Sequence, residues 1–309
     1  MKHFIHLKDI PASDLRKIIS DAKKRKIKRK NLDILDVDKD TPLKGKLLIQ
    51  MFEKSSLRTR LSFYLAIKQL GGGSLTLRPD ELHLSKGGES LADTAKILST
   101  YGNGFMLRSD SNEKLEQFKR YLKIPIINGL SPSSHPTQVL SDVFTIEEIK
   151  KKPISKMNIC WIGDCNNVLN SLIVASAKFS FNLNIGCPKK YEPKKSLIDW
   201  LKKKEKKINV FNNAIEAASN ADVIFSDKVI SLNDKVNKKK KIKDFKNFQI
   251  NTKLMRFAKK DAIFLHCLPR GYEVSDEVFL GKQSKVWQQA LNRIYVQKSI
   301  LLYCFNKLR

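Results

Sequence analysis

Short apolar segments alternate with longer helical patterns along most of this chain, and this alternation restricts its fold more than any other feature. An apolar run over 47–52 is followed by a helical pattern over 60–70, and the succession returns about every 20–30 residues. Strands alternating with helices form parallel sheets that the helices cover, so the expected fold class is α/β with such sheets. The other expected strands are 74–77, 104–107, 124–128, 157–162, 183–186, 221–225 and 262–265.

Length and composition fit a two-domain protein without a membrane anchor. The 309 residues suit two domains of about 150 each, and 41% of them are hydrophobic. No apolar run approaches the roughly 20 residues of a membrane span, and the N-terminus lacks a signal-peptide layout. The five cysteines are odd in number and lack the paired spacing of metal ligands. We therefore expect a reduced, cytoplasmic protein without a metal.

The formal net charge of +28 raises the question of a nucleic-acid partner. The lysines gather in runs over 23–30, 194–207 and 235–243, which are typical of solvated surfaces. A nucleic-acid-binding protein usually has a recognisable module or aromatic residues between its cations, and neither is present. The charge is therefore interpreted as a surface bias that attracts anionic substrates, without specific nucleic-acid binding.

The segment after the first strand has the composition of an anion site. Ser56, Arg58 and Thr59 stand where a helix begins. The first N–H groups of a helix lack partners within it, and the helix dipole places partial positive charge there. Hydroxyl and guanidinium donors suit phosphate oxygens. On these residues alone, a capped helix with surface arginines is an equally good interpretation.

Three later motifs favour the anion site over the capped helix with surface arginines. Arg108 ends an apolar run, His135-Pro136-Thr137-Gln138 opens a helix, and His266-Cys267-Leu268-Pro269-Arg270 follows a late strand. Together with Ser-x-Arg-Thr-Arg at 56–60, the series resembles the aspartate/ornithine carbamoyltransferase family over nearly the whole chain. The cysteine after His266 is similar to the ornithine branch of that family. Each motif is weak alone, but four in this order are specific.

This resemblance implies both an architecture and a reaction. The carbamoyl-phosphate-binding domain would span 1–134 and be completed by a C-terminal helix over 286–309. The ornithine-binding domain would span 135–285, with crossing helices joining the domains and the active site between them. The implied reaction converts carbamoyl phosphate and L-ornithine to L-citrulline and phosphate, in arginine biosynthesis, without a cofactor. A dinucleotide site is disfavoured because Gly-x-Gly-x-x-Gly is absent after 157–162.

On the carbamoyl phosphate side, the resemblance implies a phosphate cradle and an oxyanion site. Arg108 and His135 would donate to the carbonyl oxygen as it gains negative charge. The plain alternatives are a surface arginine at a strand end and a helix-capping histidine. The implied binding residues are Ser56, Leu57, Arg58, Thr59, His83, Arg108, His135, Pro136, Thr137, Gln138 and Arg293.

On the ornithine side, the resemblance assigns groups to each end of the substrate. Asn167 would bind the α-carboxylate, and Asp227 and Ser231 the α-amino group. Cys267 would orient the δ-amine and accept its proton, although a small buried core residue is the plain alternative. The implied ornithine-binding residues are Asn167, Asp227, Ser231, Leu232, Cys267 and Leu268, and the implied catalytic residues are Arg108, His135, Asp227 and Cys267.

Most of these residues share one position, directly after an expected strand. Ligands of open α/β sheets bind at the carboxyl ends of the strands. Packing alone does not explain why residues such as Arg108, Asn167, Asp227 and Cys267 all fall at such ends. The distribution predicts one cleft with phosphate recognition on one sheet and a second substrate on the other.

The sequence departs from the family pattern at several positions. Leu57 stands in place of a threonine, which removes one hydroxyl contact but keeps the backbone N–H. Leu232-Asn233 replaces Met-Gly, and Leu291 replaces a glutamate that would orient Arg293. No departure removes a central group, although each is expected to weaken affinity.

The resemblance also implies a homotrimer whose active sites lie between subunits. The polar loop over 78–89 would carry His83 to a neighbouring phosphate site, and an ordinary solvent-exposed loop is the alternative. Rival functions are transfer to another amine, such as putrescine, an acylated ornithine or aspartate. A more distant rival is a basic polyanion-binding protein on a decayed enzyme scaffold.

Overall fold

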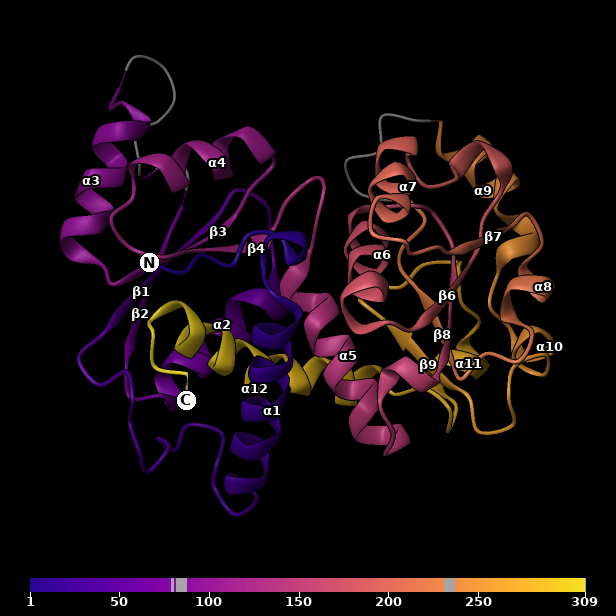
Figure 1. Cartoon of the computed structure of the whole chain (residues 1–309), viewed down its shortest axis with the longest axis horizontal. Coiled ribbons are helices and arrows are strands. Elements are labelled where there is room, and N and C mark those ends of the chain that lie inside the picture. The colour runs from indigo at the N-terminus through magenta and orange to yellow at the C-terminus, as the bar shows by residue number, and fades with distance from the viewer. Residues whose placement is uncertain (79–80, 82–87, 231–236, 309) are drawn as a thin grey trace. The chain divides into compact units, whose positions relative to one another are not determined.

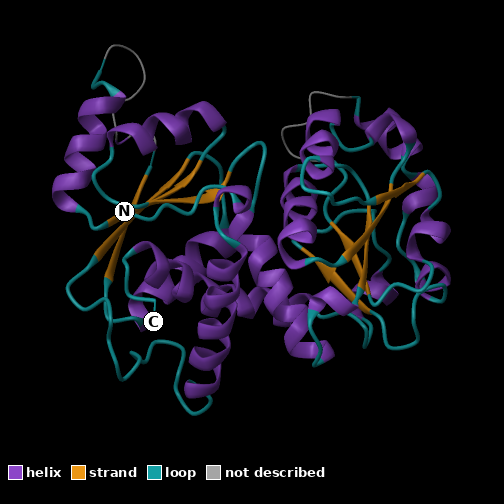
Figure 2. Cartoon of the chain, in the orientation of Figure 1, coloured by secondary structure: helices purple, strands orange, loops and turns teal. Residues whose placement is uncertain are grey.

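The chain divides into two compact units, each built on its own sheet. Unit 1 comprises Met1–Phe144 with Leu291–Arg309, and unit 2 comprises Thr145–Ala290. This computed structural model describes residues 1–78, 81, 88–230 and 237–308. Both sheets are parallel, as the strand–helix alternation predicts, and helices cover them (Figures 1 and 2).

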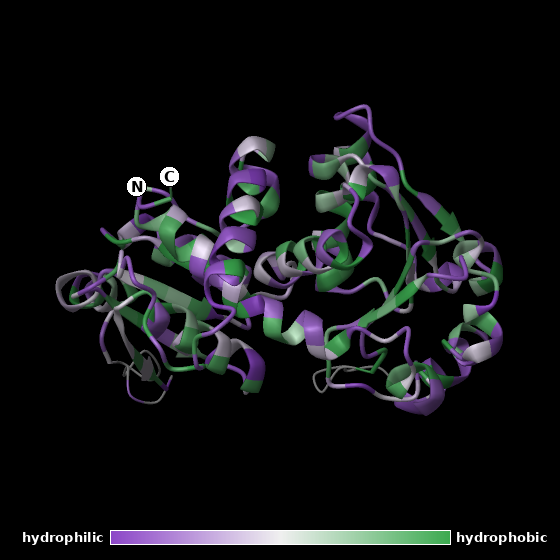
Figure 3. Cartoon of the chain, turned by 90° about the horizontal axis from the view of Figure 1, so that it is seen from below, coloured by the Kyte–Doolittle hydropathy of each residue, from purple (hydrophilic) through white to green (hydrophobic). Residues whose placement is uncertain are grey.

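Unit 1 contains a four-stranded sheet in the order β2-β1-β3-β4. The central strands β1 and β3 are apolar along most of their length and almost entirely buried. Near-continuous apolar runs are typical of parallel strands covered on both faces. Figure 3 shows the strands mainly in hydrophobic or neutral colours. The strands are β1 (Leu47–Phe52), β2 (Gly73–Leu77), β3 (Gly104–Arg108) and β4 (Ile126–Leu130).

The helices of unit 1 lie on both sides of this sheet. Helices α3 and α4 lie on one side, and α1, α2 and the C-terminal part of α12 lie on the other (Figure 1). Ser90 and Ser111 cap α3 and α4 by accepting hydrogen bonds from the backbone N–H groups of Asp93 and Lys114. The helices are α1 (Ala12–Lys28), α2 (Leu57–Gln69), α3 (Leu91–Tyr101), α4 (Asn112–Tyr121), α5 (Pro136–Lys150) and α12 (Val286–Cys304). The unit boundaries fall within α5 and α12.

Helix α12 is fixed to α1 by buried charges. Lys298 Nζ lies 2.7 and 2.6 Å from the two carboxylate oxygens of Asp38. The same carboxylate accepts from Arg25 and Arg29, each at 2.9 Å. Ser299 Oγ donates to Asp21 of α1 at 2.7 Å. These contacts explain why the C-terminal segment belongs to unit 1, although it follows unit 2 in the sequence.

Unit 2 contains a five-stranded sheet in the order β7-β6-β5-β8-β9. Residues of β5, β8 and β9 contribute to one hydrophobic core that also includes helix residues on one face of the sheet. The expected strands correspond to β5, β6, β8 and β9, whereas the short β7 was not expected because it contains only three residues. The strands are β5 (Asn158–Ile162), β6 (Asn182–Gly186), β7 (Asn209–Phe211), β8 (Val223–Ser226) and β9 (Ile263–His266).

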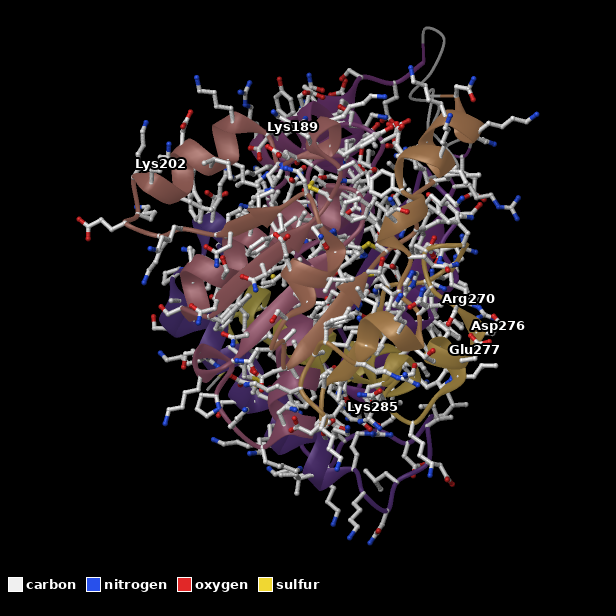
Figure 4. All side chains as sticks on the ribbon, turned by 90° about the vertical axis from the view of Figure 1, so that its right-hand side faces the viewer. Lys189, Lys202, Arg270, Asp276, Glu277 and Lys285 are labelled. Carbon is white, nitrogen blue, oxygen red and sulfur yellow. The ribbon has the colours of Figure 1, made fainter. Side chains whose placement is uncertain are left out.

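The helices of unit 2 again flank the sheet, with α6 and α7 on one side and α8 and α10 on the other (Figure 1). Helices α7 and α9 carry two of the lysine runs. Lys189 and Lys202 are exposed, and Figure 4 shows both on the outer surface of this unit. The helices are α6 (Asn167–Phe179), α7 (Lys195–Lys202), α8 (Ala214–Ala218), α9 (Lys238–Asp244), α10 (Thr252–Met255) and α11 (Asp276–Leu280).

Two local expectations need correction. Helix α2 begins at Leu57, three residues before the expected start, so the motif at 57–59 forms its first turn. Strand β4 covers Ile126–Leu130 and extends beyond the expected 124–128, because its edge pairs with β3 as far as Leu130. Across the described residues, no helix is long and apolar enough to cross a membrane.

Candidate active site

The N-terminus of α2 carries the residues of unit 1 that are expected to bind an anion. Ser56 is its N-cap residue, and Leu57, Arg58 and Thr59 form the first turn. Among the described atoms Ser56 Oγ makes no capping bond to this helix and instead accepts from Arg108 Nη1 at 3.1 Å. The first N–H groups therefore point out of the helix end without a side-chain cap, along the positive end of the dipole. This arrangement suits a phosphate group.

Arg108 reaches this helix end because β1 and β3 are neighbours. The last residue of β1 lies opposite Arg108, so the loop after β1 and the end of β3 leave the sheet at the same edge. Glu53 joins them, since its carboxylate accepts from Ser109 Oγ at 2.7 Å and Asp110 N–H at 3.0 Å, and pairs with Lys114. Sequence reasoning missed Glu53 because these partners lie at least 56 residues away.

His135 lies directly before α5 and is buried. Its pKa lies well below the ordinary 6.5, first because of burial and then because of the guanidinium groups of Arg293, Arg108 and Arg58. The imidazole is therefore neutral at pH 7 and retains one N–H donor. Its Nδ1 lies 3.4 Å from Oγ1 of Thr137. The result is a neutral donor in a strongly positive environment.

The expected carbamoyl phosphate residues of unit 1 and the expected ornithine residues of unit 2 are each called a half-site. Arg293 comes from α12 and joins two segments of the half-site of unit 1. Its Nη2 donates to Thr59 Oγ1 at 2.8 Å, and its Nη1 donates to Gln138 Oε1. Gln138 Nε2 donates in turn to Asp142 Oδ1 at 2.8 Å. All four residues are buried. Sequence reasoning singled out Thr59, Gln138 and Arg293 but not Asp142, which follows the His-Pro-Thr-Gln motif by one helical turn.

The departure at Leu291 does not expose Arg293. Leu291 is 40% exposed on the outer side of α12, whereas Arg293 is 2% exposed and held by Thr59 and Gln138. Pro136 begins α5, a favourable place for proline because the first helical N–H has no partner within the helix. Thr137 is fully buried in the same first turn.

Unit 2 gathers polar residues where β5, β8 and β9 end. Gly163 ends β5 with φ +142°, a conformation that favours glycine, and turns the chain toward α6. Asn166 caps α6 by accepting from Val168 N–H at 2.9 Å and Leu169 N–H at 3.2 Å. Its Nδ2 donates to Asp227 Oδ2 at 2.8 Å. Sequence reasoning named Asn167, the first residue of α6, but missed this role of its neighbour.

Asp227 is a carboxylate held in a low-polarity environment. Burial raises its pKa above the ordinary 3.8, and Glu273 adds to the increase. His266, the N–H of Lys228 and the side chain of Asn166 act in the opposite direction. A carboxylate of this kind favours a cationic ligand, because a nearby positive charge offsets the cost of its desolvation.

Cys267 follows β9 on a turn with well-defined hydrogen bonds. The backbone N–H of Leu268 donates to His266 Nδ1 at 2.9 Å, and Leu268 has φ +60°. His266 Nε2 lies 3.1 Å from Glu273 Oε1, and both side chains are buried. Cys267 is 8% exposed beside this pair. Three other expected site residues, His83, Ser231 and Leu232, lie outside the described residues.

Two family models together cover most of the chain. Residues 2–148 match the model described as "Aspartate/ornithine carbamoyltransferase, carbamoyl-P binding domain". Residues 155–304 match the model described as "Aspartate/ornithine carbamoyltransferase, Asp/Orn binding domain". The chain belongs to the aspartate/ornithine carbamoyltransferase family.

Individual members of the carbamoyltransferase family are similar along their full length. The ornithine carbamoyltransferase of Brucella suis is 42% identical, covering 99% of this chain and 96% of the relative. That of Rhodopseudomonas palustris is 43% identical, covering 99% and 97%.

Solved structures of ornithine carbamoyltransferases also align with nearly the whole chain. The ornithine carbamoyltransferase from Pyrococcus furiosus aligns with a TM-score of 0.90 at 36% identity, covering 97% of this chain and 96% of that one. The anabolic enzyme from Campylobacter jejuni aligns with a TM-score of 0.89 at 38% identity, covering 99% and 100%.

The two family models divide the half-site of unit 1 between them. Ser56, Arg108, His135 and Gln138 lie within the segment matched by the carbamoyl-P model. Arg293 lies within the segment matched by the Asp/Orn model, although it packs in unit 1. Among the described residues, no three His, Cys, Asp or Glu side chains gather as a metal site.

Proposed function

We propose that this carbamoyltransferase-family chain is an ornithine carbamoyltransferase that converts carbamoyl phosphate and L-ornithine to L-citrulline and phosphate. The observation that carries the proposal is the presence of both half-sites in one chain. Relatives named ornithine carbamoyltransferase match 99% of the length of this chain. Unit 1 has a cationic helix end that suits a phosphorylated substrate, and unit 2 has a partly buried carboxylate that suits a cationic one. Arginine biosynthesis in the cytoplasm is the setting that we infer for this reaction.

Carbamoyl phosphate is assigned to unit 1. Its phosphate would accept from the first turn of α2, where Ser56, Leu57, Arg58 and Thr59 supply N–H, hydroxyl and guanidinium donors. Its carbamoyl group would lie toward Arg108, His135 and Gln138, with Pro136 and Thr137 shaping the start of α5.

L-Ornithine is assigned to unit 2. Asn167 would bind the α-carboxylate, and Asp227 the α-ammonium group by a charge-assisted hydrogen bond. Ser231 and Leu232 would complete this contact. Cys267 and Leu268 would lie beside the δ-amine, at the turn after β9.

The reaction then requires one nucleophilic attack. The δ-amine, after losing a proton to water or to the thiolate form of Cys267, donates its electron pair to the carbamoyl carbon. The carbonyl electrons move onto oxygen, where Arg108 and the neutral His135 donate hydrogen bonds to the oxyanion. When the C=O bond re-forms, the bond to phosphate breaks and phosphate leaves with that electron pair. The excess proton on the attacking nitrogen passes to an oxygen of the departing phosphate, which leaves neutral citrulline. Each donor is worth roughly 3–4 kcal/mol of transition-state stabilisation.

The assembly that we propose is a homotrimer with sites shared between subunits. Closed symmetric assembly is the usual state of soluble oligomers. His83 would enter the phosphate site of a neighbouring subunit, where it adds a donor to a position already rich in positive charge. A site of this kind would be incomplete in an isolated subunit.

Citrulline formation across a small panel of amines tests the proposal. L-Ornithine should exceed putrescine and aspartate in kcat/KM by at least about 100-fold, because those analogues leave buried polar groups without partners. The rate should rise with pH through the neutral range, since only the uncharged δ-amine attacks and His135 is already neutral there. Comparable rates with putrescine would contradict the assignment of ornithine.

An acidic amine substrate is a weaker alternative for a physical reason. Asp227 is partly buried, and desolvation of its carboxylate raises its pKa, so negative charge is costly at this position. A substrate carboxylate beside it would increase that cost. The alternative function suggested by the excess of lysines is nucleic-acid binding. We expect any such binding to be weak and salt-sensitive.

A further inference from the structure

Four buried side chains of unit 1 form a continuous hydrogen-bonded chain from α5 to α2. Asp142 accepts from Gln138, Gln138 accepts from Arg293, and Arg293 donates to Thr59. None of the four is more than 2% exposed. We propose that Asp142 is a positioning residue, which orients the amide of Gln138 so that its oxygen recognises the carbamoyl NH2 group. The inference rests on the assignment of carbamoyl phosphate to this unit.

The orientation of the Gln138 amide follows from the chemistry of its two partners. An ionised carboxylate has no proton to donate, and a guanidinium group has no lone pair to accept with. The NH2 group of Gln138 must therefore face Asp142, and its oxygen must face Arg293. The reverse orientation would place two acceptors together at one end and two donors together at the other.

The same polarity determines what Gln138 and Thr59 offer to a ligand. An amide oxygen has two lone pairs, so the oxygen of Gln138 can accept from Arg293 and from a ligand N–H at the same time. Thr59 Oγ1 accepts from Arg293 at 2.8 Å, which directs its own O–H proton away from the guanidinium group. The chain thus presents one acceptor and one hydroxyl donor on α5 and α2, near the positive end of α2.

This pair matches the two ends of carbamoyl phosphate. The carbamoyl NH2 group is a donor and needs an acceptor, whereas the phosphate oxygens need donors. Acetyl phosphate has a methyl group in place of NH2 and would leave the Gln138 oxygen with an unmet lone pair. Unit 1 should therefore discriminate between these two ligands through Gln138, and Asp142 should control that discrimination without touching either ligand.

The experiment compares the affinities of wild type and Asp142→Asn for carbamoyl phosphate and acetyl phosphate by calorimetry. Asparagine keeps the size of the side chain but replaces the charge-assisted hydrogen bond to the Gln138 NH2 group with a weaker neutral one, so the Gln138 amide is held less firmly in its orientation. The affinity ratio of carbamoyl to acetyl phosphate should fall at least about fivefold, the effect of roughly one lost hydrogen bond. Inorganic phosphate, which lacks the carbamoyl group, reports on the phosphate position alone.

Two further variants separate positioning from a general structural loss. In a Gln138→Leu background, Asp142→Asn should leave the ligand ratio unchanged, because residues that act through one another are not additive. Ser141→Ala is the matched control on α5, since Ser141 is equally buried and donates within the helix, to the Thr137 carbonyl at 2.9 Å. It should leave the ratio at the wild-type value.

The outcomes are distinct. An unchanged ratio in Asp142→Asn, or an equal fall in the Gln138→Leu background, would overturn the positioning role. If Asp142→Asn does not fold, neutron diffraction of the wild type decides, because deuterium on the Gln138 nitrogen must face Asp142. A wild type that neither binds carbamoyl phosphate nor forms citrulline would instead overturn the proposed function.

Discussion

At the scale of single residues, the protein sets the behaviour of its ionisable groups by burial and by the charges beside them. His135 is buried and Asp227 is partly buried, and both pKa shifts favour the uncharged form. For His135 this ensures a neutral hydrogen-bond donor amid arginines. For Asp227 it creates a position that a cationic ligand stabilises. In unit 1 the same effect acts on Lys298, which no proposed step of the reaction uses.

Lys298 should make the stability of unit 1 depend on pH. Burial is the main cause that lowers its pKa from 10.5 to about 8, while Asp38 opposes the shift. Above about pH 8 the unfolded chain holds this proton more tightly than the folded one, so the contribution of Lys298 to stability rises with pH up to about pH 10. Below that window the charged lysine keeps its full desolvation cost.

The variant Lys298→Met removes the titrating group but leaves Arg25 and Arg29 on Asp38. In urea unfolding, the stability of the variant relative to wild type should fall by about 2–3 kcal/mol between about pH 7 and pH 10. This difference isolates Lys298 from all other titrating groups. A difference that stays constant across that range would mean that the lysine keeps its ordinary pKa.

Leu57→Thr should strengthen carbamoyl phosphate binding by about 0.5–1.5 kcal/mol, the value of one added hydrogen bond. Leu57 is 69% exposed in the first turn of α2, so its removal costs little buried apolar area. Calorimetry provides the measurement. The control is Leu61→Thr, which makes the same change at an exposed position one turn further along α2. Equal effects of both variants would exclude a specific phosphate contact.

At the scale of elements, helix N-termini position much of both half-sites. The first turns of α2 and α5 present the expected carbamoyl phosphate residues, and the cap of α6 lies beside Asp227. Each of these helices follows a strand of a parallel sheet, so their N-termini lie at the carboxyl edge of that sheet. In α6 one residue, Asn166, both caps the helix and donates to Asp227, so capping is linked to the proposed ornithine contact.

Asn166→Ala should lower both stability and ornithine affinity. Loss of the cap costs about 1 kcal/mol of unfolding free energy. Loss of the 2.8 Å bond to Asp227 should also raise the KM for ornithine by at least about tenfold. Steady-state kinetics and thermal unfolding give the two quantities. The affinity for carbamoyl phosphate should stay unchanged.

The matched control is Asn213→Ala at the start of α8. Asn213 caps its helix through the same pair of contacts, accepting from Ile215 N–H at 2.8 Å and Glu216 N–H at 3.4 Å. It should lose similar stability while the KM for ornithine stays at the wild-type value. If Asn213→Ala raises that KM as much as Asn166→Ala does, loss of helix stability alone explains the effect.

At the scale of the whole molecule, the chain consists of two units with complementary chemistry. Unit 1 surrounds a helix end with arginines, and unit 2 holds a partly buried carboxylate next to a helix cap. The lysines of α7 and α9 do not belong to either group of residues, and most of them are exposed. The charge on the outer surface is therefore considered separately. The proposed trimer would add a contribution from a second chain to unit 1.

Complementation tests that assembly. Arg108→Ala and His83→Ala proteins should each be strongly impaired. When they are unfolded together and refolded as an equal mixture, about one site in four should combine His83 of one chain with Arg108 of another. Those sites are wild type, so activity should recover in proportion. If no mixture exceeds the weighted mean of the two mutants, His83 acts within its own chain.

The sequence by itself determined the class of the fold and the positions of most elements. Apolar runs such as 47–52 and 262–265 correspond to β1 and β9 within one residue. The cap of α3 is equally local, since Ser90 accepts from the backbone N–H of Asp93 three residues later. These features depend on near neighbours in the chain, because periodicity and capping involve residues within a few positions of each other. The family resemblance likewise depended on short motifs in order.

Only the tertiary structure decided which of these residues meet. Arg293 contacts Gln138 across 155 positions, and Asn166 contacts Asp227 across 61. Cys165 and Cys187, which have no local pairing signal, lie with their sulfur atoms 3.8 Å apart at the ends of β5 and β6. Such contacts follow from the order of strands in a sheet and from the packing of α12 on α1, which no local pattern specifies. For the same reason Glu53 became visible only in the folded chain, and so did the link from Asp142 through Gln138 to Arg293.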